Sequence, residues 1–237
     1  MGSDLTFITN EENNNLRGRF KALIKGTRFF DCLVGYFYTS GFFSIYKALE
    51  KTEKIRILIG ISTNKQSYDL LAAASKEKEQ SLQFSHAETK DAVSGLFEKE
   101  MEESEDNYSV EEGVLKFIEW IRSEKLEIRA YPSQNIHAKL YIMTFAESDR
   151  DKGRVITGSS NFTKAGLVDN LEFNVELKTI ADYEFAKNKF EELWSDSVDI
   201  SEKYIETIMN KTWLNQNITP YELYLKFLYE YFKDELN

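Results

Sequence analysis

Helical and strand-like segments alternate in the first sixty residues, and this order constrains the fold more than any other feature. Amphipathic spacing predicts helices over residues 15–25 and 40–51, with Ser40 as the expected N-cap of the second. Apolar, strand-like runs at 31–37 and 54–60 follow these helices in turn. Helices that alternate with buried strands need a sheet to cover, so we expect an α/β sandwich.

The pattern resumes after residue 108. Ser109 and Glu112 form an expected capping box ahead of another amphipathic helix. The strands expected after it span 126–131, 136–143, 154–157 and 171–178, and the helices that follow span 183–194, 200–213 and 221–236. We therefore expect an α/β domain over residues 1–180 and a small C-terminal helical extension over 181–237. The last helix is apolar on more than one face, which predicts a second packing partner.

A polar stretch interrupts this alternation and carries much of the negative charge. The net charge is −10, and eight acidic residues with one lysine lie between Glu98 and Glu112. We expect residues 65–108 to be an acidic helical insertion. The rest of the chain is less acidic, which leaves room for a basic surface. One cluster of cationic residues could be such a surface or simply a solvated helix face. That cluster is Arg17, Arg19, Lys21, Lys25 and Arg28.

The remaining composition favours an intracellular protein. Cys32 is the single cysteine, lies in an apolar run and is expected to fill the core in a reducing cytoplasm. No segment approaches the roughly 20 apolar residues of a membrane span, so no membrane partner is expected. The three tryptophans fall on predicted helices with apolar neighbours, which indicates packing roles: Trp120, Trp194 and Trp213.

Two short motifs carry the candidate chemistry. His137 and Lys139 lie two apart in an expected strand, so their side chains should project from the same side. A second apolar run ends in the turn Gly158-Ser-Ser-Asn161, whose hydroxyls, amide and backbone N–H groups can hold phosphate oxygens. A nucleophile, a cation and an anion-binding turn together indicate attack on a phosphodiester.

These motifs resemble those of the phospholipase D superfamily, H-x-K-x4-D followed by G-S-x-N. Glu172 matches an acidic residue that follows in many members, whereas Thr144 stands where the aspartate is expected. Longer sequence segments, such as His137-Ala-Lys-Leu-Tyr141, are similar to the N-terminal phospholipase D-like region of bacterial Swi/Snf-type helicases. A related branch contains restriction endonucleases. The resemblance implies a phospholipase D-like α/β/α sandwich around a mixed sheet, with helicase domains following downstream.

The resemblance also implies roles for the motif residues. His137 would attack phosphorus to form a phosphohistidine, and Glu172 would accept a hydrogen bond from its ring, with no metal or cofactor required. Phosphate oxygens would be bound by Lys139, Asn161, Ser159 and Ser160, the last also serving the turn. A second histidine would protonate the leaving oxygen. The other histidine, His86, lacks the accompanying lysine, so a homodimer with one motif per subunit is expected.

Three function classes follow from these observations. The first is a nuclease domain that cuts DNA as part of a helicase or restriction protein. The second is a noncatalytic DNA-binding or dimerisation module of the same larger protein, an alternative that Thr144 and the acidic composition leave open. The third, a lipid phosphodiesterase, needs an apolar entry surface or membrane-binding segment that the sequence does not indicate.

Overall fold

A computed structural model gives the fold of most of the chain. It describes residues 6–11, 14–35, 37, 39–60, 108–132, 136–203 and 205–206, together with 224 and 228. The expected acidic insertion with His86 therefore lies outside the described residues apart from Tyr108, as do Trp213, the second half of the expected helix 200–213 and nearly all of the expected helix 221–236.

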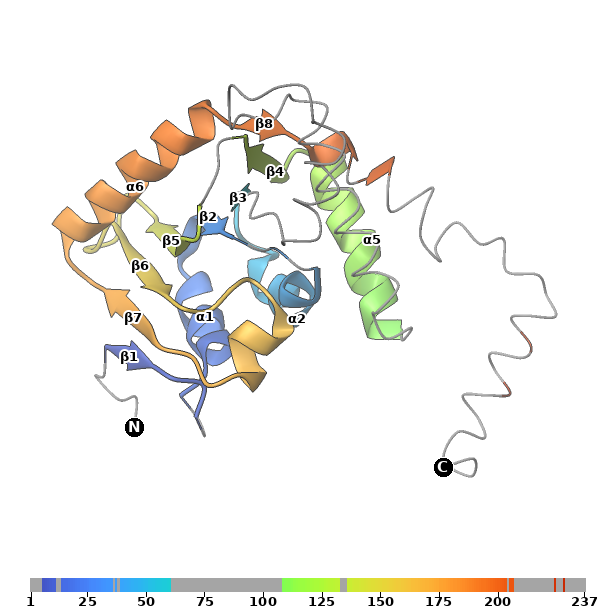
Figure 1. Cartoon of the computed structure of the whole chain (residues 1–237), viewed down its shortest axis with the longest axis horizontal. Helices are drawn as coiled ribbons and strands as arrows, with labels where there is room; N and C mark the ends of the chain where they lie inside the picture. The colour runs from blue at the N-terminus through green and yellow to red at the C-terminus, as the bar shows by residue number, and fades with distance from the viewer. Residues whose placement is uncertain are drawn as a thin grey trace, which may run out of the picture.

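A mixed sheet forms the centre of the molecule (Figure 1). Within the described residues it has eight strands, in the order β1-β7-β6-β5-β2-β3-β4-β8. The neighbours β2, β3 and β4 run parallel, and the other pairs are antiparallel. The strands are β1 (Phe7–Ile8), β2 (Thr27–Val34), β3 (Lys54–Gly60), β4 (Leu126–Tyr131), β5 (Lys139–Phe145), β6 (Gly153–Gly158), β7 (Asn174–Leu177) and β8 (Val198–Asp199).

Helices cover both faces of this sheet, which confirms the α/β/α sandwich (Figure 1). One face packs against α1 (Leu16–Ile24), α2 (Thr39–Leu49), α5 (Tyr108–Arg122) and the short π-helix η1 (Ala165–Asp169). The opposite face packs against α6 (Ile180–Ser195). Side chains alternate between the two cores along β2, where Phe30 and Cys32 face the first group and Leu33 faces α6.

The helix α6 belongs with the sheet rather than with a separate helical unit. Its buried side chains Tyr183, Phe190 and Trp194 pack in one cluster with Ile142 and Val155 of the sheet. The chain then returns to the sheet, because β8 pairs antiparallel with β4. The part of the expected C-terminal extension beyond residue 206 lies outside the described residues, apart from 224 and 228.

Several expected boundaries are wrong by a few residues. The helix α2 begins at Thr39, so Ser40 lies inside it instead of capping it, and α5 already includes Tyr108, so Ser109 is also an internal residue. The strand β5 begins at Lys139 instead of residue 136, and β7 begins at Asn174 instead of residue 171. Local spacing locates an element well but not the residue at which its hydrogen-bond ladder begins.

Expectations about the core hold. Cys32 is fully buried, and burial raises the pKa of its thiol well above the ordinary value. Trp120 and Trp194 are buried against other core side chains, as their helical context predicted. None of the helices among the described residues is both long and apolar enough to traverse a membrane.

Candidate functional site

The candidate site lies at one end of the central strands of the sheet. The strand β5 runs antiparallel to β2 on one side and to β6 on the other, with Lys139 opposite Val34 and Leu140 opposite Thr157. The start of β5 therefore lies beside the ends of β2 and β6. In this way the topology places the His137/Lys139 motif next to the turn that follows Gly158, although about twenty residues separate the two in sequence.

His137 sits just before β5 in an exposed, irregular segment, so the expectation that it lies in the strand is wrong. A methyl group placed on Gly35, immediately after β2, would lie 3.8 Å from His137 Cα and 3.9 Å from Asn161 Oδ1. Both motif residues therefore approach the same glycine. Lys139 joins them, because its Nζ donates a hydrogen bond to the His137 carbonyl at 2.9 Å. The histidine, lysine and asparagine of the two motifs are thus brought together.

Two glycines make room for the segment that carries His137. A Cβ at Gly60, the last residue of β3, would lie 2.5 Å from the carbonyl oxygen of Ile136, and a Cβ at Gly35 would lie 3.3 Å from the same atom. A side chain at Gly60 would therefore displace this backbone. The sequence reasoning missed this role for both residues. A signal was present, since Gly60 ends one expected strand and Gly35 lies near the end of the other.

The Gly-Ser-Ser-Asn turn is supported from inside the core. Ser160 is fully buried, its hydroxyl accepts a hydrogen bond from Asn174 Nδ2 at 2.8 Å, and its N–H donates to Asn174 Oδ1 at 3.3 Å. The Tyr141 hydroxyl donates to the Ser160 carbonyl at 2.7 Å, and burial raises the pKa of this tyrosine. The expectation that Ser160 contacts phosphate is therefore not supported by its position. Sequence reasoning also missed Asn174 and Tyr141 as supports of the turn.

Ser159 is the exposed hydroxyl of the same turn and is held by the segment before β7. Its Oγ donates a hydrogen bond to the Glu172 carboxylate and accepts one from Phe173 N–H at 3.0 Å. The carboxylate was expected to bind the ring of His137, but the hydrogen bond that the structure gives it is with Ser159. The cause is the register of the β6–β7 pair, which sets Gly158 opposite Asn174 and so brings Glu172 alongside Ser159.

Thr144, at the position of the family aspartate, lies far from this end of the strands. It is five residues along β5 from Lys139, which corresponds to about 17 Å at the usual rise of ~3.4 Å per residue. It lies on the face of β5 that α6 covers, and its hydroxyl shares a hydrogen bond of 2.9 Å with the Tyr183 hydroxyl. The threonine therefore takes part in packing α6 and does not contact the motif histidine.

Two members of the expected basic cluster are engaged in ion pairs. Arg19 makes a two-pronged contact with the buried carboxylate of Glu176, at 2.6 and 2.8 Å, and this hydrogen bonding raises the pKa of the guanidinium. Arg28 pairs in the same way with Glu53. These two arginines therefore stabilise the domain through protein carboxylates, which favours the simpler interpretation of this cluster as a helix face.

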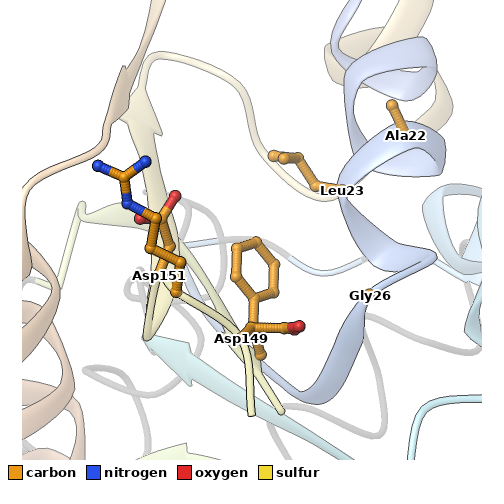
Figure 2. A pocket seen from close by; sticks show the side chains of 7 residues that line it. Ala22, Leu23, Gly26, Asp149 and Asp151 are labelled. Atoms are coloured by element: carbon orange, nitrogen blue, oxygen red, sulfur yellow. The ribbon is translucent and has the colours of Figure 1, made fainter. Parts of the chain in front are cut away.

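A separate hollow of about 340 Å³ lies at the opposite end of β5 from His137 (Figure 2). Its walls are formed by the last turn of α1 and the loop after β5, and Figure 2 shows Leu23 of the helix across from Asp149 and Asp151 of the loop. Its polar lining is Asp149, Arg150 and Asp151, so two carboxylates outweigh one guanidinium, and the hollow is a poor site for a phosphodiester. No group of three His, Cys, Asp or Glu side chains suited to a metal ion occurs within the described ranges.

Comparison with known proteins agrees with this architecture. Residues 32–194 match the model of a family described as "Cardiolipin synthase, PLD-like domain". No curated protein matches the chain. Among solved structures, Nuc of Salmonella typhimurium, a phospholipase D family member, is similar at 15% identity over 81% of this chain and 95% of its own, with a TM-score of 0.44.

Two further solved structures are similar at the same low level. NucT from Helicobacter pylori is 14% identical over 76% of this chain and 88% of its own, with a TM-score of 0.38. TrmBL2, an archaeal chromatin protein, is 16% identical with a TM-score of 0.41; the match covers 84% of this chain but only 55% of that protein. The family match spans more than half of the sequence and includes both motifs. The chain therefore belongs to the PLD-like domain family.

Proposed function

We propose that this chain is a phosphodiesterase domain that acts on DNA, with His137 as its nucleophile. The observation that carries the proposal is the shared approach of His137 and Asn161 to Gly35, with Lys139 bonded to the His137 backbone. These residues carry an imidazole, an ammonium group and an amide, which are the groups needed to attack and hold a phosphodiester. Family membership supports the same reaction class.

The reaction proceeds in two displacements. A ring nitrogen of His137 attacks phosphorus, a nitrogen–phosphorus bond forms, and the ester bond to the leaving oxygen breaks as that oxygen takes a proton from a second histidine. Water then gives a proton to the second histidine and attacks the phosphohistidine, the nitrogen–phosphorus bond breaks, and the phosphomonoester leaves. Lys139 exchanges its contact with the His137 carbonyl for one non-bridging oxygen, and Asn161 and Ser159 bind the other, the Ser159 hydroxyl giving up its hydrogen bond to Glu172.

The second histidine is supplied by another copy of the chain. This sequence contains one His-x-Lys motif, and its other histidine lacks the lysine partner. A twofold axis beside the exposed His137 would bring the motifs of two subunits together in a symmetric site. We propose that the homodimer is the active form and that it serves as the DNA-cutting part of a helicase or restriction protein.

Cleavage of labelled DNA in EDTA tests this function. Wild type should release products, because a histidine nucleophile needs no metal, whereas His137→Ala should lose at least about a thousandfold in rate. Lys139→Ala should lose about a hundredfold, since it removes one group that stabilises transition-state charge. Binding is measured in parallel on the same samples.

The outcomes separate the function classes. Binding with steep salt dependence but without products, equal in wild type and His137→Ala, would identify a noncatalytic DNA-binding module. Inert behaviour of all three proteins in both assays would reject the nuclease proposal. Unfolding curves of the variants serve as the folding control, because His137 is exposed and its removal should leave stability within about 0.5 kcal/mol of wild type.

A further inference from the structure

Phe173 is a large aromatic side chain in an unusual place. Its side chain is 62% exposed, next to Glu172 and beside the turn that would hold the phosphate. The aromatic side chains at the centre of this fold are buried instead, including Phe20, Phe30 and Phe162. Single exposed aromatic rings are common on protein surfaces, but the ring of Phe173 lies beside the candidate phosphate-binding turn, where it is available to a bound ligand.

The backbone of Phe173 is tied to the phosphate-binding turn. Ser159 N–H donates to the Phe173 carbonyl at 3.1 Å, and Phe173 N–H donates to Ser159 Oγ at 3.0 Å. Gly158 allows this approach, because a Cβ there would lie 2.2 Å from the Phe173 carbonyl oxygen. The base of the ring is therefore fixed relative to Ser159. Ser159 follows β6 and Phe173 precedes β7, and these hydrogen bonds of about 3 Å hold the two residues together just beyond the paired strands.

We propose that Phe173 is a stacking platform for an unpaired nucleobase next to the scissile phosphate. The inference rests on the proposed function and names its substrate class: single-stranded nucleic acid. A phosphate held by Ser159 carries its base one sugar away, within reach of a ring anchored at this distance. Aromatic rings bind the faces of all bases, so the platform gives affinity without sequence preference. A base paired within a duplex cannot offer its face.

The apolar neighbour Leu171 is 65% exposed and flanks Glu172 on the other side. Two isolated apolar side chains that bracket a carboxylate offer area for a base and its sugar, but not the extended apolar face that binds a lipid surface. The ring could also contact a second copy of the chain, and the experiment below includes that outcome. Continuity with the phosphate-binding turn is what favours the nucleotide.

Binding of a short fluorescent thymidine oligonucleotide tests the platform through anisotropy. Phe173→Ala and Phe173→Leu should weaken binding between about fivefold and a hundredfold, the range of one base–aromatic stack, and Phe173→Trp should restore it. Phe185→Ala is the matched control, because Phe185 is 75% exposed on α6 and should leave binding unchanged. The corresponding duplex should bind wild type and Phe173→Ala alike.

A small chromogenic phosphodiester separates this inference from the proposed function. It has no base to stack, so all of these variants should hydrolyse it as wild type does. If Phe173→Ala hydrolyses the small ester and binds the oligonucleotide as tightly as wild type does, the platform is overturned. The phosphodiesterase proposal then stands. Wild type that binds no oligonucleotide would also overturn it. A Phe173→Ala protein that sediments as a smaller species would assign the ring to a subunit interface and reject the platform.

Discussion

The position of Thr144 in the fold decides whether its departure from the family aspartate affects the candidate site. It stands where the family pattern has an aspartate, yet its hydroxyl is bonded to Tyr183 at the end of β5 remote from His137. The threonine in place of the aspartate therefore affects the packing of α6 and not the groups that would contact phosphate. It gives no ground for regarding the site as inactive.

Replacement of Thr144 should consequently alter stability and not catalysis. Thr144→Ala is expected to lose about 1 kcal/mol of unfolding free energy, the net value of one hydrogen bond, with phosphodiesterase activity within about twofold of wild type. Urea unfolding and initial rates measure the two quantities. Tyr183→Phe removes the same bond and should give a similar loss. A folded Thr144→Ala protein without activity would show that this position does reach the chemistry.

Other residues show what the sequence could and could not predict. His137, Lys139 and Asn161 were identified because their types and spacing are specific to the motif, and the structure brings these three together. The partner of Glu172 was misassigned, because it depends on the β6–β7 register, which the sequence does not specify. Gly35 was overlooked because its importance lies in the absence of a side chain beside residues distant in sequence.

At the scale of elements, α6 is fixed to the sheet by charge as well as by apolar packing. Asp31 is buried at the centre of β2, where Arg56 donates to one oxygen at 2.6 Å and Lys187 of α6 to the other at 2.5 Å. Glu191, one helical turn further on, accepts from Arg56 at 2.6 and 2.9 Å. A carboxylate in this interior position is tolerable only because two cations and their hydrogen bonds compensate its desolvation.

Glu191 makes the attachment of α6 dependent on pH. Hydrogen bonds from Arg56 and Lys187 lower its pKa from 4.5 to about 2, so the folded state favours the charged form. Its stabilisation is fully present above about pH 4.5 and is lost as the pH falls toward 2. Because the side chain is 46% exposed, Glu191→Gln should cost less than about 1 kcal/mol at pH 7.

Denaturant unfolding of wild type and Glu191→Gln at pH 7 and pH 3 measures this effect. The difference in unfolding free energy between the two proteins should narrow at the lower pH, because Glu191 of the unfolded wild type takes up a proton below about pH 4.5. Glu192→Gln is the control, since Glu192 is 63% exposed and pairs only with Lys189 among the ion pairs described. An equal difference in unfolding free energy at both pH values would mean that the ion pairs of Glu191 do not stabilise the attachment of α6.

The order of elements was easier to predict than their assembly. Periodicity located α1, β3, β4 and α6, since each presents a clear apolar face or run. It could not assign α6 to the sheet, because the buried Asp31 and its cations come from three separate elements. The short strands β1 and β8 were missed altogether, since two residues carry no periodicity.

At the scale of the whole molecule, the exposed segment that carries His137 is half of the proposed two-histidine site. If each site needs a histidine from both subunits, a wild-type subunit paired with His137→Ala becomes inactive. Co-expression of the two in equal amounts should leave about a quarter of the wild-type activity per total protein, whereas independent sites would leave about half. Activity per total protein distinguishes the values. Mixing with a tagged wild type measures whether the two chains pair at random.

The nucleophilic role of His137 can be observed directly by trapping its covalent intermediate. Wild-type protein is mixed with a labelled phosphodiester in EDTA, quenched early in the reaction and digested for mass spectrometry. We expect a phosphoryl adduct on the peptide that contains His137, stable in base and labile in acid, and none in His137→Ala. Turnover of the substrate with the adduct on another residue, or with none at any time, would contradict the proposed mechanism.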